Sequence, residues 1–402
     1  MNKLLALPVA VTTVLSLSAG ADAAEINVGS VAGVTGPIAE LVAPIVAGRN
    51  LAAEHVNAQG GLLGGDSLNL VLADSACDPK AGVDAGGKVV NVEQVVAVVG
   101  ASCSGATNGM VQSVTIPAGV VSVSDSATAP SITALEDNDL VFRVAPSDAY
   151  QGAALAKLAY DSGARNLAMT YSNDDYNAGI AEVFEQSFTA MGGKITANQA
   201  HEPNKASYRS EMSTLANGNP DGLALFAYYG SSGIAIIRNS LENGLFDKFF
   251  AADGMFDVSV IEQIGADNLK GNIQITQSAS DYDDVSYQTW ADLYKATGND
   301  PKAPYAAHGY DATFLVALAI EKAGAADRSK ISAALREVAN APGEIIRPGE
   351  WEKAKALIAE GKDINYEGST GNVDFDENGD VAGIYGVNTV GDDGTWANEL
   401  IK

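Results

Sequence analysis

Short apolar runs rich in β-branched residues alternate along this chain with longer segments of helical periodicity. In the first part of the chain this pattern predicts buried strands at Ile26 to Val31, Leu68 to Ala73, Val95 to Val99 and Val120 to Val123. It predicts helices between them, at Val42 to Asn57, Gly82 to Asn91 and Thr107 to Val114. Regular alternation of this kind builds right-handed βαβ units, in which helices cover both faces of a parallel sheet. We therefore predict an α/β fold.

The same alternation restarts after Pro146. It predicts helices at Gln151 to Ser162, Ala178 to Met191, Tyr208 to Ala216 and Gly233 to Asn243, and strands at Leu167 to Tyr171, Lys194 to Asn198, Leu223 to Tyr228, Phe249 to Ala252 and Asn272 to Gln277. Further helices are predicted at Ser286 to Thr297, Ala306 to Lys322, Lys330 to Asn340 and Pro348 to Glu360, followed by a terminal β segment around Val373 to Val390.

Two open sheets of one kind, with no flexible linker between them, predict two doubly wound parallel-sheet lobes joined by a hinge. The length of 402 residues also favours two domains over one. We expect a first lobe formed by residues 25–145 and about 278–370, and a second lobe formed by residues 146–277 and about 371–402.

The N-terminus has the pattern of a secretory signal peptide covering residues 1–24. A single Lys3 precedes an apolar run from Leu4 to Leu17, and the segment ends in the small residues 21–23, Ala-Asp-Ala. We expect cleavage after Ala23 or Ala24. No cysteine stands at the cleavage point, so we expect a periplasmic protein without a lipid anchor.

Acidic side chains outnumber basic ones by 50 to 24, for a formal net charge of -26. This excess argues against nucleic acid and anionic lipid surfaces as partners, because both would repel the protein. The two cysteines, Cys77 and Cys103, both lie in the exported part. In an oxidising compartment such a pair is most simply a disulfide, and two free buried thiols are the alternative.

Ligands of open α/β sheets bind outside the carboxyl ends of the strands, so the residues that follow each strand are the candidates for a site. Hydroxyl-rich loops follow the predicted strands that end at Val99 and Val123, and they contain Ser104, Ser126 and Thr128. Hydroxyls and free backbone N–H groups at helix starts suit a carboxylate. Ordinary N-capping is the alternative for any one of them.

In the second half, the corresponding positions carry aromatic residues and a carboxylate. Tyr176, Tyr228 and Tyr229, and Asp253 follow successive strands. Tyrosine faces and a carboxylate together suit an ammonium group. We assign Tyr228 to core packing at the end of its strand, and a surface turn is the alternative for Asp253.

Several motifs, in this order and spacing, resemble those of the periplasmic leucine/isoleucine/valine-binding protein family, the type I substrate-binding proteins of branched-chain amino acid ABC transporters. They are Gly36-Pro37-Ile38-Ala39, Asn57-Ala58-Gln59-Gly60-Gly61, Ala76-Cys77-Asp78-Pro79, Cys103-Ser104, Ala127-Thr128-Ala129-Pro130, Phe142-Arg143 and Tyr176 with Gly179. The resemblance covers nearly the whole mature chain and implies the type I periplasmic binding protein fold.

The resemblance also implies roles for individual residues. Cys77 and Cys103 correspond to the family's disulfide in the first lobe. Ser104 and Thr128 match residues that bind the carboxylate and amino groups of the ligand, while Ser126 and Ala127 match backbone contacts. Tyr176 and Tyr229 match aromatic residues of the second lobe, and Asp253 occupies the place of an acidic partner for the ammonium. The best-known aliphatic binders have Glu in place of Asp253 and an aromatic residue near Leu41.

The resemblance therefore predicts a monomeric, non-catalytic protein that binds a small amino acid, branched-chain or otherwise aliphatic, and delivers it to an inner-membrane ABC permease. The alternative is a ligand-sensing protein on the same scaffold that binds a different small amide or carboxylate and presents it to a receptor.

The residues themselves give little support to an enzyme, and we expect neither a cofactor nor a metal. The three histidines, His55, His201 and His308, are dispersed along the chain. Neither a Gly-x-Ser-x-Gly elbow nor a Gly-x-Gly-x-x-Gly after the first strand occurs. The string from Asp374 to Gly379 resembles half of a calcium loop, but an Asn-Gly hairpin turn explains the same residues.

Overall fold

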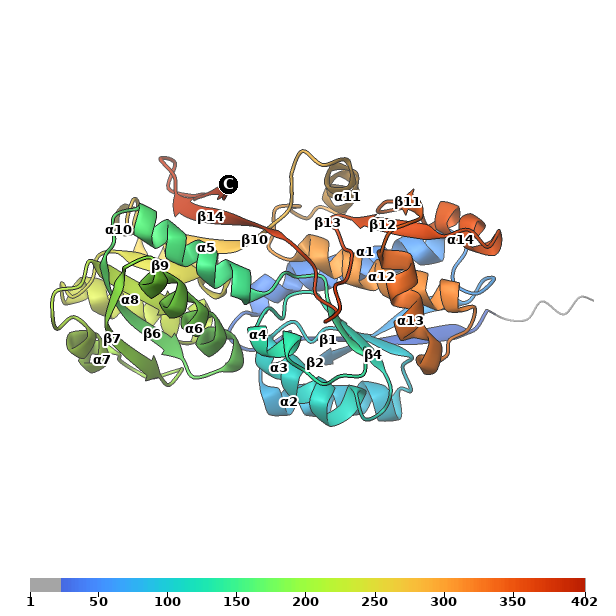
Figure 1. The fold of residues 1–402 in the computed structure, drawn as a ribbon, viewed down its shortest axis with the longest axis horizontal. Helices are drawn as coiled ribbons and strands as arrows, with labels where there is room; N and C mark the ends of the chain where they lie inside the picture. The colour runs from blue at the N-terminus through green and yellow to red at the C-terminus, as the bar shows by residue number, and fades with distance from the viewer. Residues whose placement is uncertain (1–22, 402) are drawn as a thin grey trace, which may run out of the picture.

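The computed structural model describes residues 23–401, and Figure 1 shows two lobes side by side. Residues 1–22 of the predicted signal peptide lie outside the described residues. The first lobe is built on a five-stranded parallel sheet in the order β2-β1-β3-β4-β5. Its strands are β1 (Glu25–Ala32), β2 (Ser67–Asp74), β3 (Ala97–Val99), β4 (Val121–Ser124) and β5 (Val141–Arg143).

The second lobe is built on a seven-stranded sheet in the order β15-β14-β10-β9-β8-β6-β7. Its parallel strands are β6 (Asn166–Ser172), β7 (Lys194–His201), β8 (Gly222–Phe226), β9 (Phe249–Ala252) and β10 (Ile273–Ala279). Two antiparallel strands, β14 (Ile384–Val390) and β15 (Trp396–Leu400), extend one edge of this sheet. The predicted α/β class with two mostly parallel sheets is therefore confirmed.

Helices cover both sheets. Those of the first lobe are α1 (Ala39–Ala58), α2 (Pro79–Gly87), α3 (Ser104–Met110), α4 (Pro130–Thr133), α11 (Val285–Ala296), α12 (Ala306–Ala323), α13 (Arg328–Ala339) and α14 (Trp351–Ala359). Those of the second lobe are α5 (Asp148–Asp161), α6 (Asp175–Ala190), α7 (Arg209–Leu215), α8 (Ile234–Glu242), α9 (Val258–Ile264) and α10 (Ala266–Leu269). Within residues 23–401, no helix combines the length and the apolar character needed to cross a bilayer.

The chain passes between the lobes more than once. It enters the second lobe after β5, returns to the first lobe after β10, and re-enters the second lobe before β14. Buried side chains of Val373, Phe375 and Val381 belong to the core of the first lobe. We therefore propose that the last crossing lies after Val381 rather than near residue 371.

The predicted β segment from Val373 to Val390 forms strand only in its second half. Residues 373–383 run without a ladder partner, and a tight turn in which Gly379 N donates to Asp376 O replaces the expected hairpin. Arg143 holds this segment, because its Nε lies 2.6 Å from Asp380 Oδ1 and its Nη2 lies 2.9 Å from Asp380 Oδ2. This segment is buried against the first lobe instead of pairing as a strand. The periodicity of the sequence does not predict this burial.

The charged segment around α14 is part of the fold of the first lobe. Trp351 is fully buried and its Nε1 donates to Gly61 O. Gln59 Nε2 donates to Gly349 O, and Lys355 Nζ donates to the carbonyls of Gly60 and Gly61. A three-stranded sheet of β11 (Glu344–Ile346), β12 (Ile364–Gly368) and β13 (Gly371–Asn372) lies beside α14. The segment thus caps the loop that follows α1.

Candidate ligand-binding site

A small cavity lies between the lobes, at the carboxyl ends of strands from both sheets. The space inside it that can hold the centre of a water molecule is about 20 Å³. The first lobe contributes Ile38, Leu41, Ser102, Cys103, Ser104 and Ser126, the second contributes Tyr176, Tyr228, Asp253 and Gly254, and Tyr305 closes it from the start of α12. The cavity therefore has room for about one water molecule as it stands, and its walls must move apart to admit a ligand.

Arg49 holds together the loops on the first-lobe side of the cavity. Its side chain is fully buried in α1, and its Nε donates across 2.7 Å to Asp125 Oδ2 in the loop after β4. Its Nη2 donates across 2.9 Å to Ser102 Oγ in the loop after β3, and its Nη1 donates to Val31 O. One guanidinium therefore fixes the ends of three neighbouring strands relative to one another.

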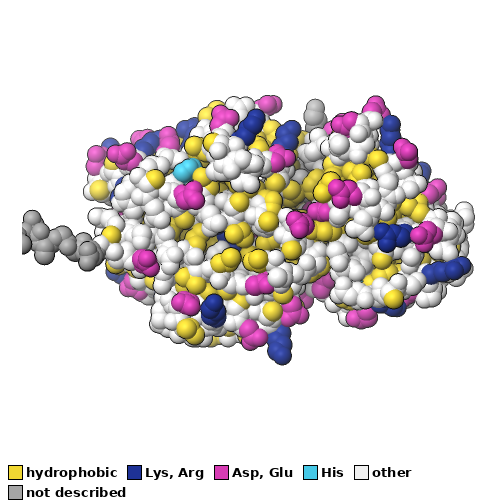
Figure 2. Space-filling view, turned by 180° about the vertical axis from the view of Figure 1, so that it is seen from behind, with side chains coloured by type: hydrophobic (Ala, Val, Ile, Leu, Met, Phe, Trp, Pro, Cys, Tyr) yellow, Lys and Arg dark blue, Asp and Glu magenta, His cyan; other side chains and the backbone are white. Residues whose placement is uncertain are grey.

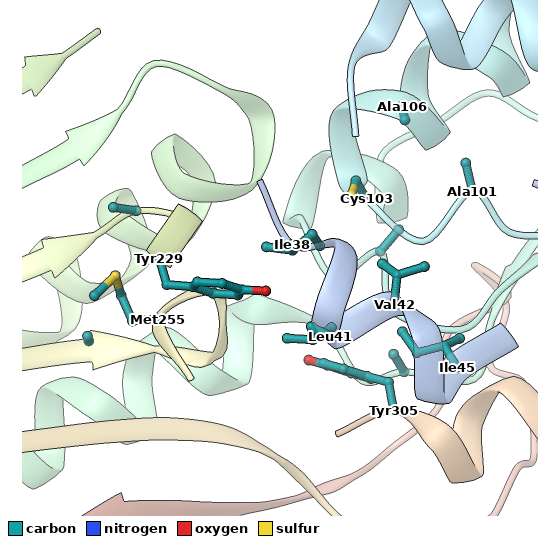
Figure 3. Close-up of a cluster of buried hydrophobic side chains, with 14 of the residues drawn as sticks. Ile38, Leu41, Val42, Ile45, Ala101, Cys103, Ala106, Tyr229, Met255 and Tyr305 are labelled. Carbon is teal, nitrogen blue, oxygen red and sulfur yellow. The ribbon is translucent and has the colours of Figure 1, made fainter. Parts of the chain in front are cut away.

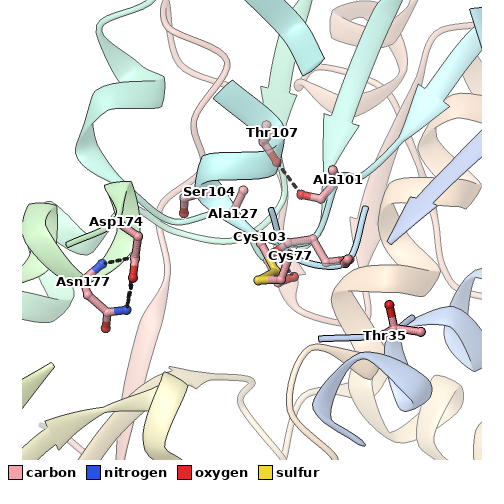
Figure 4. Close-up of a disulfide and its surroundings, with 12 residues drawn as sticks. Thr35, Cys77, Ala101, Cys103, Ser104, Thr107, Ala127, Asp174 and Asn177 are labelled. Atoms are coloured by element: carbon pink, nitrogen blue, oxygen red, sulfur yellow. Dashed lines mark hydrogen bonds between the residues drawn. A yellow bond between two sulfur atoms is a disulfide. The ribbon is translucent and has the colours of Figure 1, made fainter. Parts of the chain in front are cut away.

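The disulfide between Cys77 and Cys103 joins the loops after β2 and β3, as predicted (Figure 4). In the loop after β3, the Thr107 hydroxyl donates to Ala101 O. Ser104, the first residue of α3, is buried at the cavity wall. Its Oγ accepts hydrogen bonds from Thr128 N at 3.2 Å and from Ala129 N at 3.1 Å, which connects the two hydroxyl-rich loops.

The other predicted first-lobe residues lie in the loop after β4. Ser126 reaches the cavity wall, and its Oγ donates to Ser102 O. Ala127 lies behind it, and its N–H donates to Ser124 Oγ within the same loop. Thr128 also lies behind the wall; its buried Oγ1 has no hydrogen-bond partner among the described residues. Such orphan hydroxyls are uncommon in protein interiors.

Asp253, directly after β9, is the anionic centre of the second-lobe side. Its Oδ1 accepts hydrogen bonds from Gln151 Nε2 at 2.6 Å and from the Tyr176 hydroxyl at 3.1 Å. The Tyr176 oxygen in turn accepts from Gly254 N at 3.1 Å. A Cβ at Gly254 would meet the Tyr176 ring at 2.9 Å, so the close approach needs glycine. Asp253 and Tyr176, both predicted, meet in the cavity.

The two neighbouring tyrosines after β8 point to different places. The Tyr228 ring stacks on that of Tyr176, with centroids 5.4 Å apart and planes 16° apart, and it lines the cavity. Tyr229 instead extends toward Ile38 and Leu41 of the first lobe and packs with them (Figure 3). The structure therefore places Tyr228 at the wall of the cavity and Tyr229 at the contact between lobes.

Besides Tyr228, which was predicted to pack in the core, at least three residues of the site had no predicted role. Tyr305 stands just before α12, more than 50 residues after β9, and its ring lies opposite Leu41 (Figure 3). Gln151 lies one turn into α5 and reaches Asp253 from outside the cavity lining. Ile38 lies in a motif that carried the resemblance, without a role assigned to it. Tyr305 and Gln151 come from segments that do not directly follow a strand, whereas Ile38 lies in the loop that follows β1.

The ionisable side chains that line the cavity are the Asp253 carboxyl and the hydroxyls of Tyr176, Tyr228 and Tyr305. Burial raises the pKa of the Asp253 carboxyl above its ordinary value, although hydrogen bonds from Gln151 and Tyr176 act in the opposite direction. Burial, and then the nearby Asp253, hold the pKa of Tyr176 well above its usual range, so the phenol stays neutral and donates. Within residues 23–401, no group of three or more His, Cys, Asp or Glu side chains is arranged to hold a metal.

Direct contacts join the lobes around the cavity. Asn108 Nδ2 of the first lobe donates to Asp175 Oδ2 of the second across 2.7 Å. A Cβ at Gly230 would meet Pro37 O at 2.3 Å, so the two backbones touch there.

On the face that Figure 2 shows, acidic and basic side chains are scattered over both lobes without forming one continuous charged patch.

Comparisons with known proteins agree with this architecture. A family model described as periplasmic binding protein matches residues 25–376. The chain is 30% identical over 349 residues to the leucine-, isoleucine-, valine-, threonine- and alanine-binding protein of Pseudomonas aeruginosa, covering 87% of this chain and 85% of that protein. It is 26% identical to the chemotactic signal transduction system substrate-binding protein BasB of Halobacterium salinarum, covering 94% of this chain and 90% of that protein.

Among solved structures, the leucine binding protein LivK from Thermotoga maritima matches with a TM-score of 0.79 and 25% identity, over 94% of this chain and 99% of that one. The family and the fold that the sequence resemblance implied are thus confirmed. Members of this family are substrate-binding proteins rather than enzymes, and the chain belongs to the periplasmic binding protein family.

Proposed function

We propose that this protein binds a small α-amino acid with an aliphatic side chain between its lobes and delivers it to an ABC permease. The observation that carries the proposal is the position of Asp253. This buried carboxylate, held by Gln151 and Tyr176, shares one cavity with Ser104 of the opposite lobe. An anion on one wall and hydroxyl donors on the other match the two charged ends of a zwitterion.

The first-lobe loops supply donors for the ligand carboxylate. Ser104 Oγ already accepts from two backbone N–H groups, which leaves its own proton to be donated to an anion. The Ser126 hydroxyl lies at the same wall, but its proton is already donated to Ser102 O. We further propose that Thr128, whose buried hydroxyl is unpaired among the described residues, gains its partner when the ligand binds.

The second lobe supplies the partners of the ligand ammonium. Asp253 neutralises the positive charge, and the stacked rings of Tyr176 and Tyr228 present aromatic surface to it. The remaining wall is apolar, with Ile38, Leu41 and the Tyr305 ring. An aliphatic side chain suits this surface once the walls move apart to admit it, because burying it there gains hydrophobic free energy without unpairing a polar group.

Because each lobe binds a different end of the ligand, we expect ligand binding to favour closure of the two lobes. A zwitterion contacts both lobes only when they are together, so it binds the closed arrangement better than an open one and shifts the population toward it. The contacts between Asn108 and Asp175, and between Tyr229 and the first lobe, are then part of the closed state.

A thermal-shift screen tests the proposal. The mature chain is unfolded and refolded to remove any bound ligand and is then tested with leucine, isoleucine, valine, alanine and threonine. A ligand at about 100 times its dissociation constant adds roughly 2.7 kcal/mol to the free energy of unfolding. Leucinamide, which lacks the carboxylate, and 4-methylpentanoate, which lacks the ammonium, are matched controls and should give far smaller shifts. Equal shifts with leucine and both controls would contradict the proposed recognition of a zwitterion.

Export and assembly belong to the same proposal. We propose that the mature chain begins after Ala23 or Ala24 in the periplasm, carries no lipid anchor and acts as a monomer. The negative net charge of -26 supports solubility and argues against adhesion to anionic lipid. Mass spectrometry of the secreted protein and light scattering in solution test these points.

The similarity to BasB favours a second candidate function, in which the closed protein is presented to a chemotaxis receptor. Deletion of the gene separates the two candidates. Loss of uptake of the labelled amino acid identifies a permease as the partner, whereas unchanged uptake with loss of chemotaxis toward that amino acid identifies a receptor.

A further inference from the structure

Asp148, the first residue of α5, is a buried carboxylate beside the cavity. It is fully buried, and its backbone N–H donates to Thr128 O, which fixes its place behind the first-lobe loop. Neither of its carboxylate oxygens has a hydrogen-bond donor among the described residues. The Thr128 hydroxyl lies near enough to lower the pKa of this carboxyl, but the two groups do not meet in the geometry of a hydrogen bond.

Other buried aspartates of the described chain show what a satisfied carboxylate looks like here. Asp125 pairs with Arg49, and Asp380 pairs with Arg143. Asp311 accepts hydrogen bonds from the Tyr366 hydroxyl and from the backbone and hydroxyl groups of Ser369 and Thr370. A buried, unpaired carboxylate is costly, so Asp148 requires a separate physical explanation.

The neighbour that explains Asp148 is Asp253. Gln151, one turn along α5 from Asp148, donates directly to Asp253, so the start of this helix lies against the anionic wall. Burial and then the Asp253 charge hold the pKa of Asp148 well above its ordinary value. The other titratable and charged groups that face the pair are Tyr176, Tyr228, Tyr305, Tyr385 and Arg143.

This neighbourhood holds two carboxylates and too little positive charge to match them. The four tyrosines are neutral, because their pKa values are all raised. Arg143 is the cation that faces Asp148, but its Nε and Nη2 already donate to Asp380, and its Nη1 donates to Ala129 O. Two like charges at close range in a buried site do not both ionise unless a cation is added.

We propose that Asp148 and Asp253 form an acid pair that holds one proton in the ligand-free protein and releases it to solvent when a protonated amine enters the cavity. The proton of the pair and the ligand ammonium then satisfy the same need for positive charge. Asp148 thereby acts as a specificity-determining residue: the site accepts ligands that carry an ammonium and rejects carboxylates without one. This inference deepens the proposed function and rests on it for the identity of the amine.

Calorimetric titration with leucine in two buffers of different ionisation enthalpy counts the released protons. In the wild type, we expect release that approaches one proton per leucine where the pair is protonated, and an affinity that rises about tenfold per pH unit there. In Asp148→Asn, which keeps the shape and removes the second acid, release should fall and the pH profile should flatten. Equal proton release in the wild type and the variant would overturn the acid pair, as would binding of benzoate as tight as that of leucine.

A second measurement needs no ligand and so separates failure of the pair from failure of the proposed function. Because the folded protein holds the extra proton, its free energy of unfolding should fall as pH rises from the ordinary carboxyl pKa toward the raised pKa of the pair. Asp148→Asn should lack this loss and be more stable than the wild type at neutral pH. The matched control is Asp125→Asn, which removes one charge of the buried pair with Arg49 and should be less stable than the wild type at neutral pH. Identical pH profiles for the wild type and Asp148→Asn would exclude the pair, whatever the ligand screen gives.

Discussion

Asn108 in the first lobe donates a hydrogen bond of 2.7 Å to the carboxylate of Asp175 in the second lobe. The bond exists only while the lobes are together, so it contributes to the closed state. Asn108→Ala should weaken ligand binding by about 1 kcal/mol, roughly fivefold, because Asp175 is exposed and regains water when the bond is lost. Calorimetric titration measures this change. Asp175→Asn, whose amide oxygen still accepts from Asn108, should bind nearly as well as the wild type; equal losses in both variants would assign the effect to charge instead.

Tyr176→Phe should weaken binding through Asp253. The phenol donates to Asp253 Oδ1 and accepts from Gly254 N, while the stack on Tyr228 needs only the ring. Loss of the hydroxyl should cost about 1 to 2 kcal/mol of binding free energy. It also removes a hydrogen bond that lowers the pKa of Asp253. The loss of binding on acidification should therefore begin at a higher pH than in the wild type, which titrations over a pH series detect.

The disulfide should stabilise the fold without being needed for recognition. Cys77 and Cys103 are 26 residues apart, and opening a loop of this length costs about 3.5 kcal/mol on the chain-entropy model. The free energy of unfolding of the double variant Cys77→Ala, Cys103→Ala should be lower by this amount. The variant should therefore unfold at a lower denaturant concentration than the wild type. Cys103 lies at the cavity wall, so the ligand affinity of the double variant is measured as well. We expect it to show whether the disulfide is needed for recognition. A variant as stable as the wild type would show that the bridge contributes little.

Asp380→Ala should be among the more destabilising single changes. It leaves the buried Arg143 guanidinium without its bidentate partner, and such losses cost about 3 to 5 kcal/mol. It also frees the segment around Phe375 from the first lobe. The control is Asp161→Ala, which breaks an exposed ion pair with Lys157 and should change the free energy of unfolding by less than about 1 kcal/mol. Urea unfolding compares the two.

The sequence was sufficient to predict most strands and helices of the two large sheets, because alternation of buried strands and amphipathic helices is a local signal. It did not predict the short strands β11, β12, β13 and β15 or the short helices α4, α9 and α10. The rule that ligands lie beyond strand ends also led to Ser104, Ser126, Tyr176 and Asp253, which the structure brings to one cavity. These residues were found because each directly follows a strand or opens the next helix.

What the sequence did not predict depends on distant parts of the chain. Tyr305 enters the cavity because α12 packs beside α1, and Gln151 reaches Asp253 because α5 lies across the end of β9. Tyr228 and Tyr229 stand where a helical turn begins, and their side chains point in different directions. Periodicity does not predict which of two adjacent residues at such a point faces the cavity. Asp148 carries no signal in the sequence, since only tertiary structure shows that its carboxylate is unpaired.

The most direct test of the account is a calorimetric titration of leucine into the refolded wild type and into Asp253→Ala. The account predicts a single site per chain in the wild type and an affinity lower by about 2 to 5 kcal/mol in the variant, because a buried ammonium is left without its partner. A circular dichroism melt confirms that the variant is folded. Equal affinity in the two proteins would contradict the assignment of Asp253, and with it the proposed recognition of an α-amino acid between the lobes.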